Sequence, residues 1–114
     1  RAERGANSST FSRLIKEIEG KIQGLYGCKT PEELRTKVSK IRQELVTLRD
    51  SQKNRSERLP DADMQERYDN LDDMINELDA INLNDYDGKG KKDKKQWLVE
   101  KQYELTSVSY PGNL

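Results

Sequence analysis

A regular apolar repeat between residues 34 and 59 constrains the fold of this chain more than any other feature. Its members follow one another at steps of four and three, and they are Leu34, Val38, Ile41, Leu45, Leu48, Gln52, Arg55 and Leu59. This spacing places the residues on one face of a helix, as in the seam of a coiled coil, and the seam turns polar toward its end. Because an apolar face must be covered, the repeat predicts a helix that packs against other helices.

Start and stop signals bound this helix and separate it from three others. Thr30 can cap the seam helix, Pro31 suits its first position, and Glu33 completes a capping box. Pro60 ends it, because the residue before a proline is pushed out of the helical region. The predicted helices cover residues 10–26, 31–58, 61–82 and 93–108, between a disordered polar tail at 1–8 and a C-terminal tail at 111–114.

The other three predicted helices carry apolar stripes with helical spacing. The stripe of the first helix consists of Phe11, Leu14, Ile15, Ile18, Ile22 and Leu25. That of the third consists of Met64, Tyr68, Leu71, Met74, Ile75, Leu78 and Ile81, and that of the last of Trp97, Leu98, Leu105 and Val108. Residues 97–99 could also form a short strand, but no other segment could pair with it. The sequence therefore predicts an all-α fold, an antiparallel three-helix bundle with an additional N-terminal helix.

Composition excludes several classes of function. The chain has 21 basic and 21 acidic residues, so no net charge favours nucleic acid or a membrane surface as a partner. Histidine is absent and Cys28 is the single cysteine, which excludes a thiol–imidazole pair, a serine–histidine triad and the usual zinc sites. We expect a protein that is not an enzyme and needs no cofactor or metal. The single cysteine and the lack of a membrane-spanning apolar run favour the cytoplasm, with the nucleus as the alternative.

Charges are nevertheless sorted sharply on the two sides of one turn. The predicted third helix has an acidic face, whereas residues 89–95 contain five lysines. Calcium is not expected in the turn, because an EF-hand register would place Leu83 and Lys94 at ligand positions. Nucleic acid is not expected either, because the acidic helix would repel a polyanion. If the third and fourth helices pack antiparallel, their acids, bases and amides share one exposed strip that suits docking onto a protein with charges of both signs.

The stretch INELDAINLNDYDGKGKKDKKQWLVEKQ, residues 75–102, resembles the end of the second helix and the start of the third helix of the BAG domain. This three-helix module defines the Bcl-associated athanogene family of co-chaperones. In that family an acidic helix ends in a motif like Glu-Ile-Asp, and a short loop, a basic pair and an amphipathic helix with a glutamine follow. The resemblance extends over residues 61–105.

The resemblance implies a chaperone-binding site formed by Asp69, Asp79, Lys94, Lys95 and Gln102. A register shifted by one residue would place two of these positions at Lys95 and Tyr103 instead. The implied partner is the ATPase domain of heat shock protein 70 chaperones. The implied activity is nucleotide exchange, in which the bound module opens the nucleotide cleft and promotes ADP release.

The regular seam also allows a different interpretation. A self-assembling coiled-coil scaffold or adaptor segment would use the seam to bind other chains, and its charges would serve solubility and register only. A homodimer formed by the exchange of helices between two copies is a further alternative that the sequence leaves open.

Overall fold

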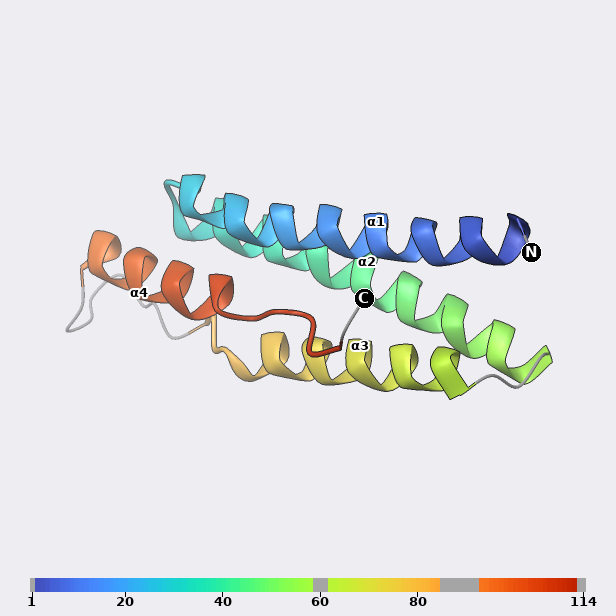
Figure 1. Cartoon of the computed structure of the whole chain (residues 1–114). Coiled ribbons are helices and arrows are strands. Elements are labelled where there is room, and N and C mark those ends of the chain that lie inside the picture. Colours follow the sequence, from blue (N-terminus) through green and yellow to red (C-terminus); the bar gives the residue numbers. More distant parts are fainter. Residues whose placement is uncertain (1, 59–61, 85–92, 113–114) are drawn as a thin grey trace.

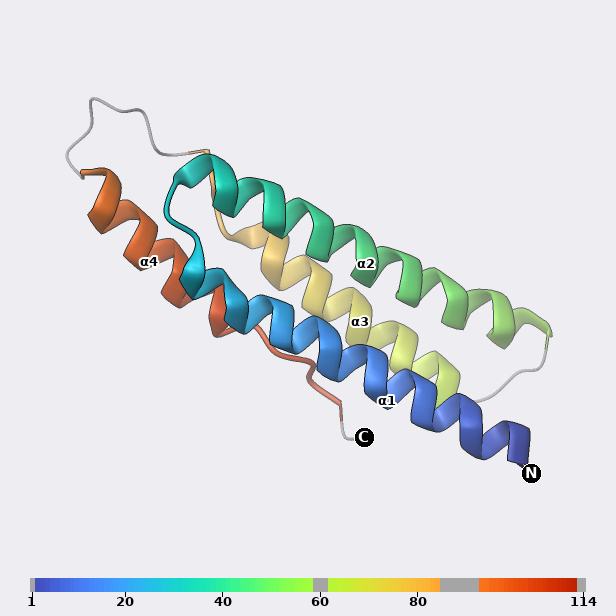
Figure 2. The ribbon, with the colours of Figure 1, turned by 90° about the horizontal axis from the view of Figure 1, so that it is seen from above.

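Four helices form where the four apolar stripes lie in the sequence. The computed structural model describes residues 2–58, 62–84 and 93–112. Helix α1 (Ala2–Gln23) leads through the 3₁₀ turn η1 (Gly24–Gly27) into α2 (Pro31–Arg58), and α3 (Ala62–Ala80) and α4 (Lys94–Thr106) follow. Successive helices run in opposite directions and form a rod of 56 × 21 × 20 Å (Figures 1 and 2). The described residues contain no strand, so the predicted all-α class is confirmed.

The helix boundaries agree with the sequence except in the first helix. Helix α1 begins at Ala2, so most of the predicted polar tail at 1–8 continues the helix, since no proline interrupts it. The helix ends at Gln23, and residues 24–27 tighten into η1. Helix α2 has the predicted limits, and α3 and α4 begin and end within two residues of theirs. The predicted stop at Pro60 lies outside the described residues.

Side chains cap the starts of both α2, as predicted, and α4. Thr30 Oγ1 accepts a hydrogen bond from the backbone N–H of Glu33 at 3.0 Å. The Glu33 carboxylate accepts in turn from the backbone N–H of Lys29 at 3.0 Å, and this bond lowers the pKa of Glu33. At α4, Asp93 Oδ1 accepts from the backbone N–H of Gln96 at 2.7 Å. Both helices therefore begin where the capping residues stand in the sequence.

The apolar stripes of all four helices meet in one core. The α2 seam is buried from Leu34 to Gln52, and the polar Gln52 side chain is only 3% exposed. The side chains of Arg55 and Leu59 lie outside the described part. The other buried apolar residues of the helices and the C-terminal segment are Phe11, Ile15, Ile18, Ile22, Leu71, Met74, Ile75, Leu78, Trp97, Leu98, Leu105, Val108 and Tyr110. The seam is thus covered within a single chain.

Helix α4 does not pair with α3. Helix α3 packs along α2, whereas α4 packs on η1 and α1. In both ribbon views α4 lies beyond the C-terminal end of α3 and not beside it (Figures 1 and 2). The predicted side-by-side pairing of the third and fourth helices is therefore wrong. The physical reason is that α2 already covers much of the apolar face of α3, and the connection over residues 81–93 is long enough to carry α4 to another site.

The segment after α4 continues along the bundle in the direction of α4, between α1 and α3 (Figure 1). The Tyr110 ring meets the Phe11 ring of α1 edge-on, with 5.9 Å between the ring centroids. The backbone N–H of Tyr110 donates to Glu19 Oε2 at 3.3 Å, and its hydroxyl bonds the side chain of Asn70 on α3. Tyr110 thus closes the bundle on a side that no helix covers.

Burial raises the pKa of the Tyr110 hydroxyl. A tyrosine in the unfolded chain ionises near its ordinary pKa of about 10. Because the folded pKa is higher, the tyrosine contributes stability below the unfolded pKa, and this contribution is lost as the pH rises through the folded pKa. We expect the free energy of unfolding of the wild type to fall faster above pH ~10 than that of the Tyr110→Phe variant. Urea unfolding along an alkaline pH series measures this difference, and parallel curves would contradict it.

Candidate protein-docking surfaces

Asp79, one of the five predicted site residues, is held by α2. Arg42 Nε donates to Asp79 Oδ1 at 2.7 Å and Arg42 Nη2 to Asp79 Oδ2 at 3.0 Å. Arg42 and Asp79 thus form a bidentate pair, in which two guanidinium nitrogens bind the two oxygens of one carboxylate. These bonds raise the pKa of Arg42. The Asp79 side chain is nevertheless 46% exposed, so its role as a contact residue stays a prediction, and a partner that binds it has to compete with Arg42.

A second ion pair joins the two helices one heptad later on α2 and one heptad earlier on α3. Arg49 Nη1 donates to Asp72 Oδ1 at 2.8 Å. Arg42 and Arg49 are seven residues apart on α2, and Asp72 and Asp79 are seven residues apart on α3. Two antiparallel helices in heptad contact bring such positions together in order. Sequence reasoning missed these pairs, although the matched spacing of arginines and aspartates was a signal that could have found them.

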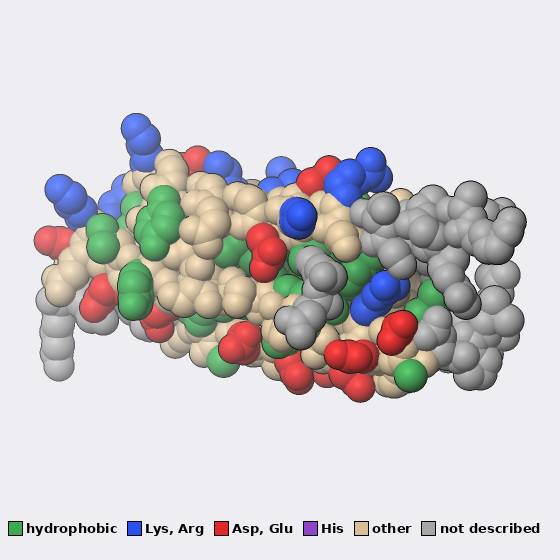
Figure 3. Space-filling model, viewed as in Figure 1, with side chains coloured by type: hydrophobic (Ala, Val, Ile, Leu, Met, Phe, Trp, Pro, Cys, Tyr) green, Lys and Arg blue, Asp and Glu red, His purple; other side chains and the backbone are tan. Residues whose placement is uncertain are grey.

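Four of the remaining acids of α3 form an exposed acidic stripe, which consists of Glu66, Asp69, Asp73 and Glu77. Steps of three and four place the four residues on one face, opposite the buried Leu71 and Ile75. Among the described residues, no lysine or arginine forms an ion pair with the stripe; Asp69 accepts a hydrogen bond from Gln65 at 3.1 Å. Acidic side chains gather along the edge of the molecule formed by α3 (Figure 3).

Lys94 and Lys95 are exposed in the first turn of α4, as predicted for contact residues. Positive charges at a helix N-terminus oppose the helix dipole, so the pair does not stabilise the helix that carries it. Because α4 lies beyond the end of α3, the lysines and the acidic stripe occupy separate regions of the molecule. The structure therefore contains both halves of the predicted strip but does not bring them together.

Gln102, the fifth predicted site residue, is inside the protein. Its side chain is 6% exposed, and its Nε2 atom donates to the backbone oxygens of Leu25, Tyr26 and Cys28 at 2.8, 3.1 and 2.9 Å. These carbonyls lie in and just after η1, where the chain leaves helical geometry, and Leu25 O also accepts from the backbone N–H of Cys28 at 3.1 Å. The prediction that Gln102 lies on an exposed strip is wrong, because its amide holds η1 on α4.

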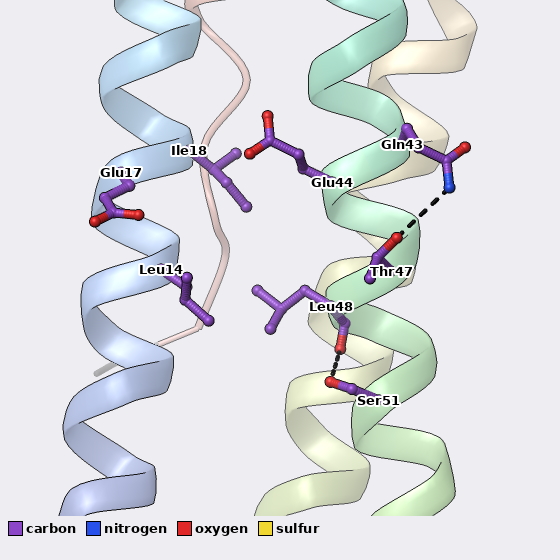
Figure 4. Close-up of a pocket in the computed structure, with 8 residues that line it drawn as sticks. All are labelled: Leu14, Glu17, Ile18, Gln43, Glu44, Thr47, Leu48 and Ser51. Atoms are coloured by element: carbon purple, nitrogen blue, oxygen red, sulfur yellow. Dashed lines mark hydrogen bonds between the residues drawn. The ribbon is translucent and has the colours of Figure 1, made fainter.

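A shallow hollow of 390 Å³ separates the middles of α1 and α2. Leu14 and Ile18 face Leu48 across it (Figure 4). Its polar rim is formed by Glu17, Gln43, Glu44, Thr47 and Ser51. Two rim groups have partners: Ser51 Oγ donates to Leu48 O at 2.7 Å, and Glu44 pairs with Lys21 of α1 at 2.6 Å. The hollow offers apolar contact and no pairing of a nucleophile with a base.

Cys28 is buried, and burial raises the pKa of its thiol. A raised pKa leaves the thiol protonated at neutral pH, which does not suit a reactive thiolate. Throughout the described ranges, no group of three or more histidine, cysteine or carboxylate side chains could hold a metal ion. No described helix has an apolar stretch long enough to cross a membrane.

Comparisons with models of known families, with curated proteins and with solved structures give no match for this chain.

Proposed function

We propose that this chain is a co-chaperone module of the BAG type, which binds the ATPase domain of a heat shock protein 70 chaperone and promotes ADP release. The sequence resemblance over residues 61–105 motivates the proposal. The observation that carries it is the acidic stripe, which α3 presents without basic partners among the described residues. An exposed row of like charges on a helix suits docking onto a basic surface of a partner protein.

Rigidity of the docking helix supports this function. An exchange factor acts by binding one conformation of its partner better than another, so its own surface must keep its shape. Helix α3 is fixed by the bonds from Arg42 and Arg49 and by its buried face. Linkage then requires reciprocity: the factor by which the module weakens nucleotide binding is the factor by which nucleotide weakens binding of the module.

The geometry changes which residues we assign to the chaperone-binding surface. Asp69, Lys94 and Lys95 are exposed and stay in the proposed site. Asp79 and Gln102 are used within the fold, and we replace them with Asp73 and Glu77 of the acidic stripe.

Charge reversal on the stripe tests this assignment. Asp69→Lys and Asp73→Lys are each expected to weaken binding to the purified ATPase domain by about 10- to 100-fold, because each removes an attraction and adds a repulsion. Binding of the wild type should also weaken as salt is raised. Isothermal titration calorimetry measures the affinities. Glu17→Lys is the matched control, since Glu17 is also an exposed acid but lies on α1. Wild-type affinity of both stripe variants would contradict the assignment.

The burial of the α2 seam argues against the scaffold alternative, which was based on that seam. The seam of α2 from Leu34 to Gln52 is buried against α1 and α3 of the same chain, so it is not available for assembly while the bundle stays folded. Sedimentation distinguishes the two functions: a scaffold gives a concentration-dependent oligomer that ignores the chaperone, whereas the co-chaperone forms a mixed complex that ATP dissolves.

A further inference from the structure

The segment that follows α4, residues 107–112, is not helical, and we call it the strap. It runs between α1 and α3 (Figure 1). Its side chains alternate: Val108 and Tyr110 are 8% and 9% exposed, whereas Ser109 and Pro111 are exposed. Successive side chains of an extended chain point to opposite sides, so this alternation turns one side of the strap to the helices and the other to solvent. The strap thus packs on the bundle as an extended peptide packs in a groove.

Tyr110 of the strap fits into a seat on α1 and α3. We define the seat by four residues, which are Phe11, Glu19, Arg67 and Asn70. The contacts of Tyr110 with the Phe11 ring, the Glu19 carboxylate and the Asn70 side chain are described above. Gly112 also approaches closely, because a Cβ atom there would lie 2.4 Å from Asn70 Nδ2 and 2.8 Å from Tyr110 Cε2. The seat therefore takes a tyrosine and, two residues later, a glycine.

Side chains, and not a ladder of backbone bonds, hold the strap in place. The backbone N–H groups of Ser107 and Val108 bond back to α4 at 3.3 and 3.2 Å. Among the described residues, no hydrogen bond joins the backbone of the strap to the backbone of α1 or α3. A cavity of 220 Å³, lined by α3 and the Tyr110 side chain, also lies beside the ring. The strap can therefore leave the seat while the helices stay in place, since segments with few backbone bonds open locally.

The contacts of the strap define what an emptied seat would accept. The incoming segment needs an apolar residue, a tyrosine two positions later and a glycine two positions after that, as in Val108, Tyr110 and Gly112. A second copy of this chain carries this segment and reproduces every contact of the strap. The strap has no charged side chain, so no charge of its own opposes the exchange. Exchange between copies loses only the advantage of the covalent link, and concentration can offset that loss.

We propose that two copies of this chain exchange straps, so that Tyr110 of each copy enters the seat of the other. The dimer is closed, because each copy gives one strap and receives one. The exchange becomes appreciable at about 1 mM, the order of magnitude of the effective concentration of a segment on a short linker. It uses α1, α3 and the strap, whereas a coiled-coil scaffold would use the α2 seam and would not need Tyr110. It does not depend on the chaperone contact proposed above.

Two full-length variants test the exchange when they are mixed. Tyr110→Ala keeps the seat but removes the ring from its own strap. Asn70→Phe keeps the strap but fills the place that Gly112 approaches. In sedimentation equilibrium we expect each variant alone to be monomeric and the mixture to form a 1:1 dimer at about 1 mM, because a free strap meets an empty seat. A mixture that is no more dimeric than its separate components would overturn the proposal.

A glycine pair and the wild type provide the controls. Adding Gly112→Ala to the Asn70→Phe chain brings a Cβ into the tight contact, so the mixture with Tyr110→Ala should dimerise at least about tenfold more weakly. Adding Gly20→Ala instead should change nothing, because a Cβ there meets no atom within 4 Å. The wild type should dimerise with rising concentration, and Tyr110→Ala alone should not. Equal dimerisation of these two proteins, or of the two glycine variants, would contradict strap exchange.

Discussion

The Gln102→Ala variant is expected to unfold with a free energy about 2–4 kcal/mol lower than that of the wild type. The Gln102 amide donates to three backbone oxygens, and two of these bonds are buried. Its removal leaves the buried Cys28 carbonyl without this donor, whereas Leu25 O keeps its bond from the backbone N–H of Cys28 at 3.1 Å. An unsatisfied buried acceptor costs more than an average hydrogen bond contributes, so this one side chain has a large effect.

Urea denaturation followed by circular dichroism measures the difference. Gln96→Ala is the matched control, because Gln96 is exposed on the same helix and only its backbone takes part in the cap. The control should stay within about 0.5 kcal/mol of the wild type. The Gln102→Glu variant should be less stable than the wild type at neutral pH and should recover part of the loss in acid, where the new carboxyl group becomes a donor. A Gln102→Ala variant as stable as the control would contradict the role of the amide.

Trp97→Ala is expected to cost about 3–5 kcal/mol, the range for removal of a large aromatic side chain from a core. Trp97 is 1% exposed, and it anchors the start of α4 in the bundle. The guanidinium of Arg35 on α2 lies 5.6 Å from the centroid of its ring, and Arg35 Nε also donates to Leu83 O at 2.7 Å. The tryptophan thus connects α4 to α2 and to the segment after α3.

The same denaturation experiment tests the tryptophan, with Val99→Ala as its control. Val99 is on the same helix but is 57% exposed, so its truncation should change stability by less than about 0.5 kcal/mol. In addition, hydrogen exchange should show that amides of α4 lose protection before those of α2 and α3 in Trp97→Ala. Equal costs for the two variants would show that α4 is not anchored by this ring.

The sequence predicted those parts of the fold that depend on periodic burial and local capping. The seam of α2 could be read directly, because a step of three or four residues has one geometric meaning on a helix. The caps at Thr30 and Asp93 were equally readable, since a cap and the N–H it bonds are three residues apart. Gln52 was predicted as a polar seam position, and it is buried.

The sequence did not predict how α3 and α4 are arranged. Periodicity tells which face of a helix is buried but not which neighbour covers it. Helix α3 could have packed on either α2 or α4, and the long connection after it imposes no hairpin. The partner of Asp79 was missed for the same reason, because Arg42 is 37 residues away in the chain.

Gln102 shows how a resemblance can conflict with spacing. Its position four residues after Leu98 and three before Leu105 places it in the buried stripe of α4. That spacing is typical of a buried position, whereas the family resemblance suggested a contact residue. The fold follows the spacing, because α4 can bury Leu98 and Leu105 against η1 only with the residue between them inside.

The most direct test of the proposed function is the release of a fluorescent ADP analogue from the purified ATPase domain of a heat shock protein 70 chaperone, followed by stopped flow. The account predicts that the release rate rises with the concentration of this chain and reaches a plateau. It also predicts that the Asp69→Lys and Asp73→Lys double variant loses the increase, whereas Glu17→Lys keeps it. A release rate that stays at its basal value when the wild-type chain is in large excess would contradict the account.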